Sequence, residues 1–232
     1  MTSQTLSAKD STAFKSLLKL FELKMYKKGL KTAETLLKKH PEHGETLAMK
    51  GLFVSNLGKR DEAHMLVKQG LRFHLTSHIC WHVYGLLHRS ERNYDEAIKC
   101  YSHALKYDRE NIHIIRDYSL LQMHMRNYSD YVTSRKLLLD LQPGNKFNWF
   151  GLAVALHLDQ QYDAAIRIID TFVSSMGSGE STICYEHGEV LLYRNMILEE
   201  SGDLQGALDH LNLIKRNCVD VVSWKETRGT LY

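Results

Sequence analysis

The sequence predicts an all-α fold built from repeated pairs of antiparallel helices. Only two of the 232 residues are prolines, Pro41 and Pro143, and Leu, Lys and Ala, which favour helices, are abundant. No alternating run of Val, Ile and Thr indicates a β-strand. Residues of the same type also recur at a spacing of 34 residues along most of the chain, which is typical of repeat proteins.

Small residues define this period most clearly. Gly51 and Gly85 lie one period apart, and so do Ala63 and Ala97. One such unit cannot bury its apolar face alone, so neighbouring units must stack into a solenoid. Five aligned units follow one another without insertion, and they begin at Asp10, Gly44, His78, Ile112 and Lys146.

The unit that begins at His78 shows the pattern best. Gly85 on its first helix and Ala97 on its second are small, so the two backbones can approach closely. Trp81 and Tyr101 then fill the space around this contact. The pattern resembles the tetratricopeptide (TPR) repeat, and this resemblance implies a TPR-type right-handed α-solenoid of helix–turn–helix units.

The period also predicts the organisation of the chain. A sixth unit, "YRNMILEESGDLQGALDHLNLI", follows out of phase, which indicates an insertion of about eight residues in the glycine- and serine-rich stretch before it. The last residues resemble the start of a further unit, as in a fragment of a longer protein. We expect a flexible N-terminus at 1–9, five units at 10–173, a loop at 174–187, a sixth unit at 188–221 and a truncated seventh at 222–232.

Composition indicates a compartment and excludes a membrane span. No apolar stretch approaches the roughly 18 residues that a transmembrane helix needs, and the first residues lack the apolar core of a signal peptide. We expect the protein to be located in the cytoplasm, with the nucleus as a second compartment, and to have no membrane partner. The four cysteines are widely spaced and form no Cys-x-x-Cys pair, so neither a zinc site nor a disulfide framework is expected.

No catalytic, cofactor-binding or metal-binding residue is predicted. His78 and His82 have a spacing that suits metal ligands, but no carboxylate or Cys nearby in sequence completes a set. Cys80 and Cys100 lack a local His–Asp arrangement that would make either a nucleophile. The glycine-rich "GSGE" lacks the Gly-Lys-Ser/Thr ending of a phosphate-binding loop. We therefore do not expect an enzyme.

A basic block at the N-terminus is the first candidate for binding. Residues 1–60 hold 12 Lys or Arg and 5 Asp or Glu, whereas the remaining residues have a net charge of −4. The block is either the soluble surface of a terminal repeat or a contact for a phosphate backbone. The candidate contacts for a phosphate backbone are Lys24, Lys27, Lys28, Lys31, Lys38 and Lys39.

The inner groove is the second candidate. In TPR folds, positions 2, 5, 9 and 12 of each first helix face the concave surface. Here these positions are mostly apolar with a few cations, which suits a partner helix or extended segment, or contact with the next superhelical turn. The candidate groove residues are His82, Arg89, Arg116, Phe147, Phe150 and His157.

The same positions exclude the carboxylate clamp of TPR co-chaperones, which needs Lys and Asn at positions 5 and 9. The corresponding pairs here are Phe14 and Leu18, Ala48 and Leu52, and His82 and Leu86.

Three longer stretches carry a more specific resemblance: "KGLKTAETLLKKHPEHGETLAMKGL", "CWHVYGLLHRSERNYDEAIKCYSHALKYD" with "IIRDYSLLQMHMRNY", and "YEHGEVLLYRNMILEESGDLQGALDHL". They are similar to the N-terminal part of the auxiliary subunit of the N-terminal acetyltransferase A complex. They include positions that TPR packing does not require, such as the "EHGE" turn at 42–45.

This resemblance implies a non-catalytic scaffold subunit. It implies a separate catalytic chain, which binds acetyl-CoA, sits mainly against repeats beyond this sequence and acetylates the α-amine of nascent chains. It also implies docking at the ribosome, which makes the six lysines of the basic block candidate contacts for ribosomal RNA. The family further suggests an inositol phosphate near the subunit interface, for which no matching site is found here. The alternative is a generic TPR peptide-binding scaffold or co-chaperone.

Overall fold

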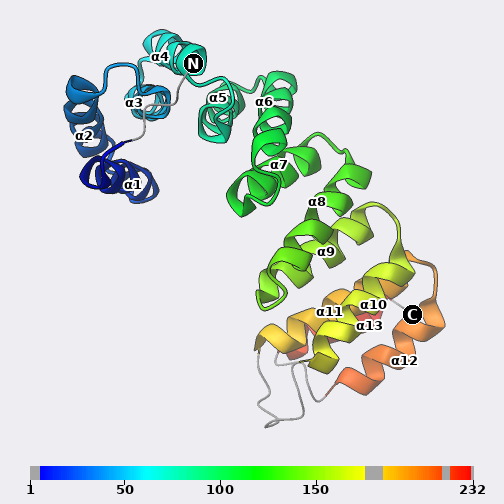
Figure 1. The fold of residues 1–232 in the computed structure, drawn as a ribbon. Coiled ribbons are helices and arrows are strands. Elements are labelled where there is room, and N and C mark those ends of the chain that lie inside the picture. Colours follow the sequence, from blue (N-terminus) through cyan, green and yellow to red (C-terminus); the bar gives the residue numbers. More distant parts are fainter. Residues whose placement is uncertain (1–5, 176–184, 216–219, 231–232) are drawn as a thin grey trace. The chain divides into compact units, whose positions relative to one another are not determined.

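The computed structural model describes residues 6–175, 185–215 and 220–230, which form thirteen α-helices and no β-strand (Figure 1). The predicted all-α class is therefore confirmed. The chain divides into two compact units, Met1–Leu121 and Gln122–Tyr232. The first contains α1 (Ala8–Glu22), α2 (Tyr26–Lys39), α3 (Gly44–Asn56), α4 (Arg60–Phe73), α5 (His78–Ser90), α6 (Tyr94–Tyr107) and most of α7 (Ile112–His124). The second contains α8 (Tyr128–Leu141), α9 (Lys146–Leu158), α10 (Tyr162–Ser175), α11 (Tyr185–Glu200), α12 (Leu204–Ile214) and α13 (Val221–Thr230).

The helices follow the sequence period closely. Helices α3, α5, α7 and α9 begin at Gly44, His78, Ile112 and Lys146, the residues at which the period places the start of a unit. The second helices, α2 to α10, begin at intervals of 34 residues.

The expected boundaries differ from the helix ends in four places. Helix α1 begins at Ala8, inside the N-terminal segment expected to be flexible, because the Ser7 hydroxyl accepts a hydrogen bond from the Asp10 amide and caps the helix. Helix α10 extends to Ser175, α11 begins three residues before the expected start of the sixth unit, and α13 begins one residue before 222. The central part of the expected loop, 176–184, lies outside the described residues.

The turn inside each unit is closed by one residue with left-handed backbone geometry. In the first three units these residues are Lys24 (φ 56°), Gly58 (φ 92°) and Arg92 (φ 62°). The next amide then bonds back to the helix, as Asn93 N–H does to the His88 carbonyl at 2.9 Å. This arrangement satisfies carbonyl groups at the helix end and stops the helix at the same position in every unit.

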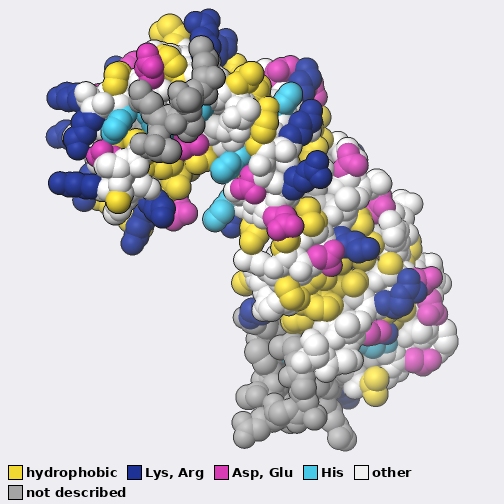
Figure 2. All heavy atoms as spheres, in the orientation of Figure 1, with side chains coloured by type: hydrophobic (Ala, Val, Ile, Leu, Met, Phe, Trp, Pro, Cys, Tyr) yellow, Lys and Arg dark blue, Asp and Glu magenta, His cyan; other side chains and the backbone are white. Residues whose placement is uncertain are grey.

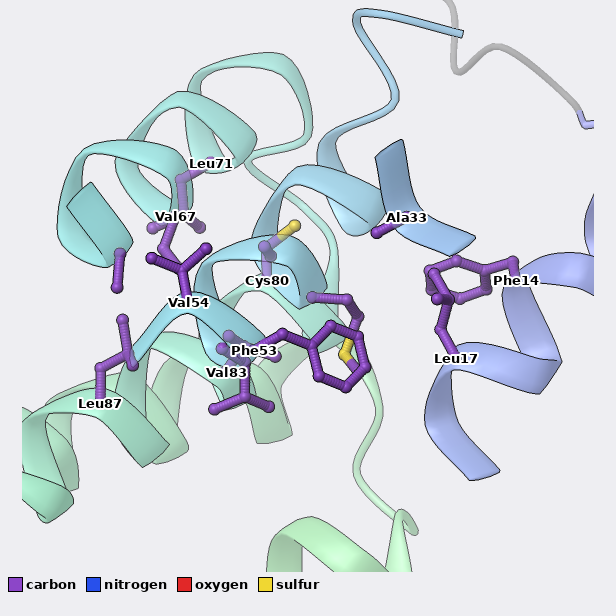
Figure 3. Close-up of a cluster of buried hydrophobic side chains, with 14 of the residues drawn as sticks. Phe14, Leu17, Ala33, Phe53, Val54, Val67, Leu71, Cys80, Val83 and Leu87 are labelled. Carbon is purple, nitrogen blue, oxygen red and sulfur yellow. The ribbon is translucent and has the colours of Figure 1, made fainter. Parts of the chain in front are cut away.

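A continuous apolar core joins the first five helices. Helix α3 packs against α1, α2, α4 and α5. Figure 3 shows its residues Phe53 and Val54 pointing toward Val67 of α4 and Val83 of α5. A second core cluster in the other unit is built from α8 to α11, around Leu152 and Ile169. Since each core extends through several helix pairs, no pair is buried by itself.

Glycine at the repeat position is required by close helix contact. A Cβ atom added at Gly85 would lie 2.6 Å from Cε1 of Tyr101, which is fully buried on α6. At Gly51, one period earlier, it would lie 2.7 Å from Val67. The small residues therefore allow the helices of a pair to approach, as the sequence predicts.

We expect Gly85→Ala to lower the free energy of unfolding by about 2 kcal/mol, because the added methyl group overpacks the contact with Tyr101. The control is Gly229→Ala, at the same repeat position in α13, where an added Cβ meets nothing within 4 Å. This control should be neutral or stabilising, since Ala favours helices by roughly 1 kcal/mol over Gly. Urea denaturation followed by circular dichroism measures both; equal effects would contradict the close-contact explanation.

Candidate functional site

The first compact unit contains a groove of about 390 Å³ along its first helices. Its floor is apolar and its α5–α7 side carries most of the charge. All four inner positions of α5 that the register predicts line this groove. The floor consists of Leu18 and Phe21 from α1, Met49 and Leu52 from α3, and Ile79, Val83 and Leu86 from α5. The polar lining consists of Glu22, His78, His82, Arg89, Asn111, His113, Arg116 and Asp117.

A carboxylate holds two of the predicted groove cations. Nε2 of His82 lies 2.9 Å from Oδ2 of Asp117, and Nη1 of Arg89 donates to Oδ1 at 3.1 Å. Burial by itself would raise the pKa of Asp117, but the hydrogen bond from His82 and the charge of Arg89 outweigh burial and lower it. Asp117 therefore remains ionised and ties α7 to α5.

The third predicted cation, Arg116, lines the same groove but is exposed, and it forms no ion pair with any described residue. The structure thus brings His82, Arg89 and Arg116 together, as the register predicts. Sequence reasoning missed Asp117. A signal was present, because Asp117 follows His82 by 35 residues, one more than the repeat period, and the first helices of successive units stack on each other.

The second compact unit has its own apolar pocket, of about 410 Å³. Phe147 and Phe150 from α9, both predicted as groove residues, line it together with Val190 and Tyr193 from α11. Phe147 is 71% exposed, which is unusual for a large apolar side chain. The α11 residues were missed because the insertion before α11 shifts it out of the common period.

His157, the remaining predicted groove residue, is not a free surface side chain. It is 9% exposed, and its two ring nitrogens lie 2.9 Å from the Tyr193 hydroxyl and 2.9 Å from Glu200 Oε2. Both partners belong to α11. The position is inward, as the register predicts, but the adjacent helix covers the side chain and uses its polar atoms.

The six candidate lysines, Lys24, Lys27, Lys28, Lys31, Lys38 and Lys39, are all exposed, on α2 or in the turn before it. Figure 2 shows Lys and Arg side chains gathered at the end of the first unit, over α1 and α2. Lys39 is partly engaged, because its Nζ lies 3.1 Å from Oδ1 of Asp10. The other five form no ion pair with a described residue.

Two of these lysines lie at positions where the second helices of other units carry acidic residues. The second helices α4, α6, α8 and α10 have acidic residues in the first turn, such as Asp61 and Glu62 in α4, and these stabilise the positive end of the helix dipole. In α2 the same two positions hold Lys27 and Lys28, and the first turn contains no acid. Like charge at a helix N-terminus is unfavourable. The fold therefore does not explain these lysines.

Other candidates for chemistry have structural roles. Cys80 and Cys100 are buried free thiols, and burial raises the pKa of each to about 12, so neither is a ready nucleophile. Phe14 and Ala48 are buried at clamp positions, so the carboxylate clamp is absent from these repeats. Within the described ranges there is no group of three potential metal ligands and no helix long and apolar enough to cross a membrane.

We expect Asp117→Asn to lower the free energy of unfolding by about 2 kcal/mol at pH 7, because the half-buried side chains of His82 and Arg89 lose a charged acceptor. The lowered pKa means that ionised Asp117 stabilises the fold above the unfolded pKa of about 3.9. This contribution disappears as the pH falls from there through the folded pKa.

The difference between wild type and variant should therefore shrink below about pH 4. Urea denaturation at several pH values tests this. Asp140→Asn, at an exposed position, is the control and should change stability by less than about 0.5 kcal/mol. A difference that persists at the lowest pH would contradict the ionic role of Asp117.

Comparisons with known proteins agree with the repeat architecture. The family model described as "Psidin, N-terminal TPR repeats region" matches residues 14–227. The chain is 45% identical over 228 residues to N-alpha-acetyltransferase 16, NatA auxiliary subunit, of Mus musculus, covering 97% of this chain and 26% of the relative. It is 43% identical over 229 residues to the N-terminal acetyltransferase A complex auxiliary subunit NAA15 of Arabidopsis thaliana, covering 98% and 26%.

A solved structure, "Structure of Naa15/Naa10 bound to HypK-THB", superimposes with a TM-score of 0.78 at 41% identity, covering 97% of this chain and 34% of that chain. The TPR protein YrrB superimposes with a TM-score of 0.65 at 12% identity, which indicates a shared fold alone. The chain spans about a quarter of the length of the curated relatives it matches. Because the family model covers most of its residues, the chain belongs to the Psidin N-terminal TPR repeat family.

Proposed function

We propose that this chain is the N-terminal TPR region of a NatA auxiliary subunit, a non-catalytic scaffold for a separate acetyltransferase chain. The names of its similar relatives support this assignment, as does the solved assembly of Naa15 with Naa10. The catalytic chain is held mainly by repeats outside the present sequence. The subunit acts in the cytoplasm, with the nucleus as a second compartment.

Affinity purification of the full-length protein tests the scaffold role. A small acetyltransferase should co-purify, and the complex should acetylate peptides that begin with small residues such as Ser or Ala. The 232-residue chain alone should show no acetyl transfer. Acetyl transfer by this chain alone, or purification without an acetyltransferase, would overturn the proposal.

The second part of the proposal is that the first repeat docks the complex at the ribosome by contacting the RNA phosphate backbone. Lys27 and Lys28 carry this argument, because they occupy positions where α4 and α6 hold helix-stabilising acids. Lys24 and Lys31 extend the same exposed surface. Lysines bind phosphate as point charges, so the contact reads charge and is weakened by salt.

The test is to give α2 the acids that α4 has, by the double change Lys27→Asp and Lys28→Glu. We expect stability to be maintained or raised by about 0.5 kcal/mol, because the acids suit the helix dipole. Ribosome co-sedimentation should fall by at least about tenfold at low salt, and its salt dependence should weaken.

The matched control is the double change Lys68→Glu and Lys106→Glu, which alters net charge equally on exposed positions of α4 and α6. It should bind ribosomes nearly as the wild type does. If the α2 variant binds like the wild type, the α2 surface does not dock the ribosome. If both variants lose binding equally, the contact depends on net charge and α2 has no specific role.

A further inference from the structure

The groove of the first unit is not used by the proposed RNA contact. The RNA-contacting lysines lie on α2 or in the turn before it, whereas the groove is lined by α1, α3, α5 and α7, together with Asn111 just before α7. These helices leave apolar surface uncovered: Leu18 is 39% exposed, and Phe21, Ile79 and Leu86 are half-buried. Each of the three half-buried residues packs on the core with one side and faces the groove with the other.

The charge on the α7 side of the groove is positive. Asp117 pairs with both His82 and Arg89, so the Arg89 guanidinium group balances the negative charge of its carboxylate. Arg116 and His113 are exposed there, and no described residue forms an ion pair with either. The acid at the opposite side, Glu22, belongs to α1. A partner segment therefore finds an apolar floor beside a free guanidinium group.

From this geometry we infer that the groove docks an acidic amphipathic segment of another protein. Apolar side chains of the segment cover Leu18, Phe21 and Leu86, and a carboxylate beside them pairs with Arg116. An arginine suits this role because its planar fork can bind a carboxylate through two hydrogen bonds. The segment is recognised along its length and not by a terminal carboxylate, since Phe14 and Ala48 replace the polar residues of a clamp.

Selection from a random peptide display library tests this inference on the full chain. Peptides of about 16 residues span roughly four helical turns, which is enough for one apolar face. We expect the enriched peptides to carry apolar residues at helical spacing of three or four, flanked by Asp or Glu. Their affinity for the Arg116→Glu variant should fall by at least about tenfold.

Matched variants separate the groove from other surfaces. Leu18→Glu, on the groove floor, should abolish binding of the enriched peptides, whereas Met65→Glu, at a position 66% exposed on α4 and outside the groove, should have no effect. The Lys27→Asp and Lys28→Glu variant should also bind these peptides normally, so this inference and the RNA proposal can fail separately. Enrichment of basic or non-amphipathic peptides, or binding unaffected by both groove variants, would overturn the inference.

Discussion

The close approach of the two helices within a unit is the contact on which the rest of the structure depends. Gly51 and Gly85 leave no room for a side chain, and the facing helices contribute Val67 and Tyr101 at that point. Larger apolar side chains reach the neighbouring pairs: Phe53 of α3, for example, lies against Phe21 of α1 and Gly29 of α2. The core clusters consequently extend across several helices. In the first compact unit, the first helices α1, α3, α5 and α7 line the groove.

Repetition helps to separate functional from structural residues, because equivalent positions in each unit have the same packing role. Where one unit has a different residue at such a position and packing does not account for it, binding of a partner is the better explanation. Lys27 and Lys28 are such a case, since α4 and α6 place acids at these positions and gain helix stability from them. The proposed RNA contact lies on α2 and the turn before it, whereas the groove proposed to dock a peptide segment is lined by α1, α3, α5 and α7. The two proposed ligands differ, since one is a phosphate backbone and the other is an amphipathic segment with an acidic residue.

Buried and half-buried polar side chains tie successive first helices together. Asp117 accepts from His82 and Arg89, and His157 bridges to Tyr193 and Glu200 of α11. Pairs of this kind hold the stacking register more specifically than apolar contact does, because a shifted helix would leave buried groups unpaired. His82, one of the two histidines with metal-ligand spacing in the sequence, forms such a pair with Asp117.

The sequence was sufficient to locate the helices and the inward positions, because both follow from local properties. The 34-residue period and the small residues at Gly51 and Gly85 place helix starts to the residue in the central units. The partners of individual side chains needed the tertiary structure, because they join helices of different units. That Asp117 engages two of the predicted cations while Arg116 stays free, and that α11 covers His157, depends on which faces stack. An insertion that breaks the period hid the α11 contribution from sequence reasoning altogether.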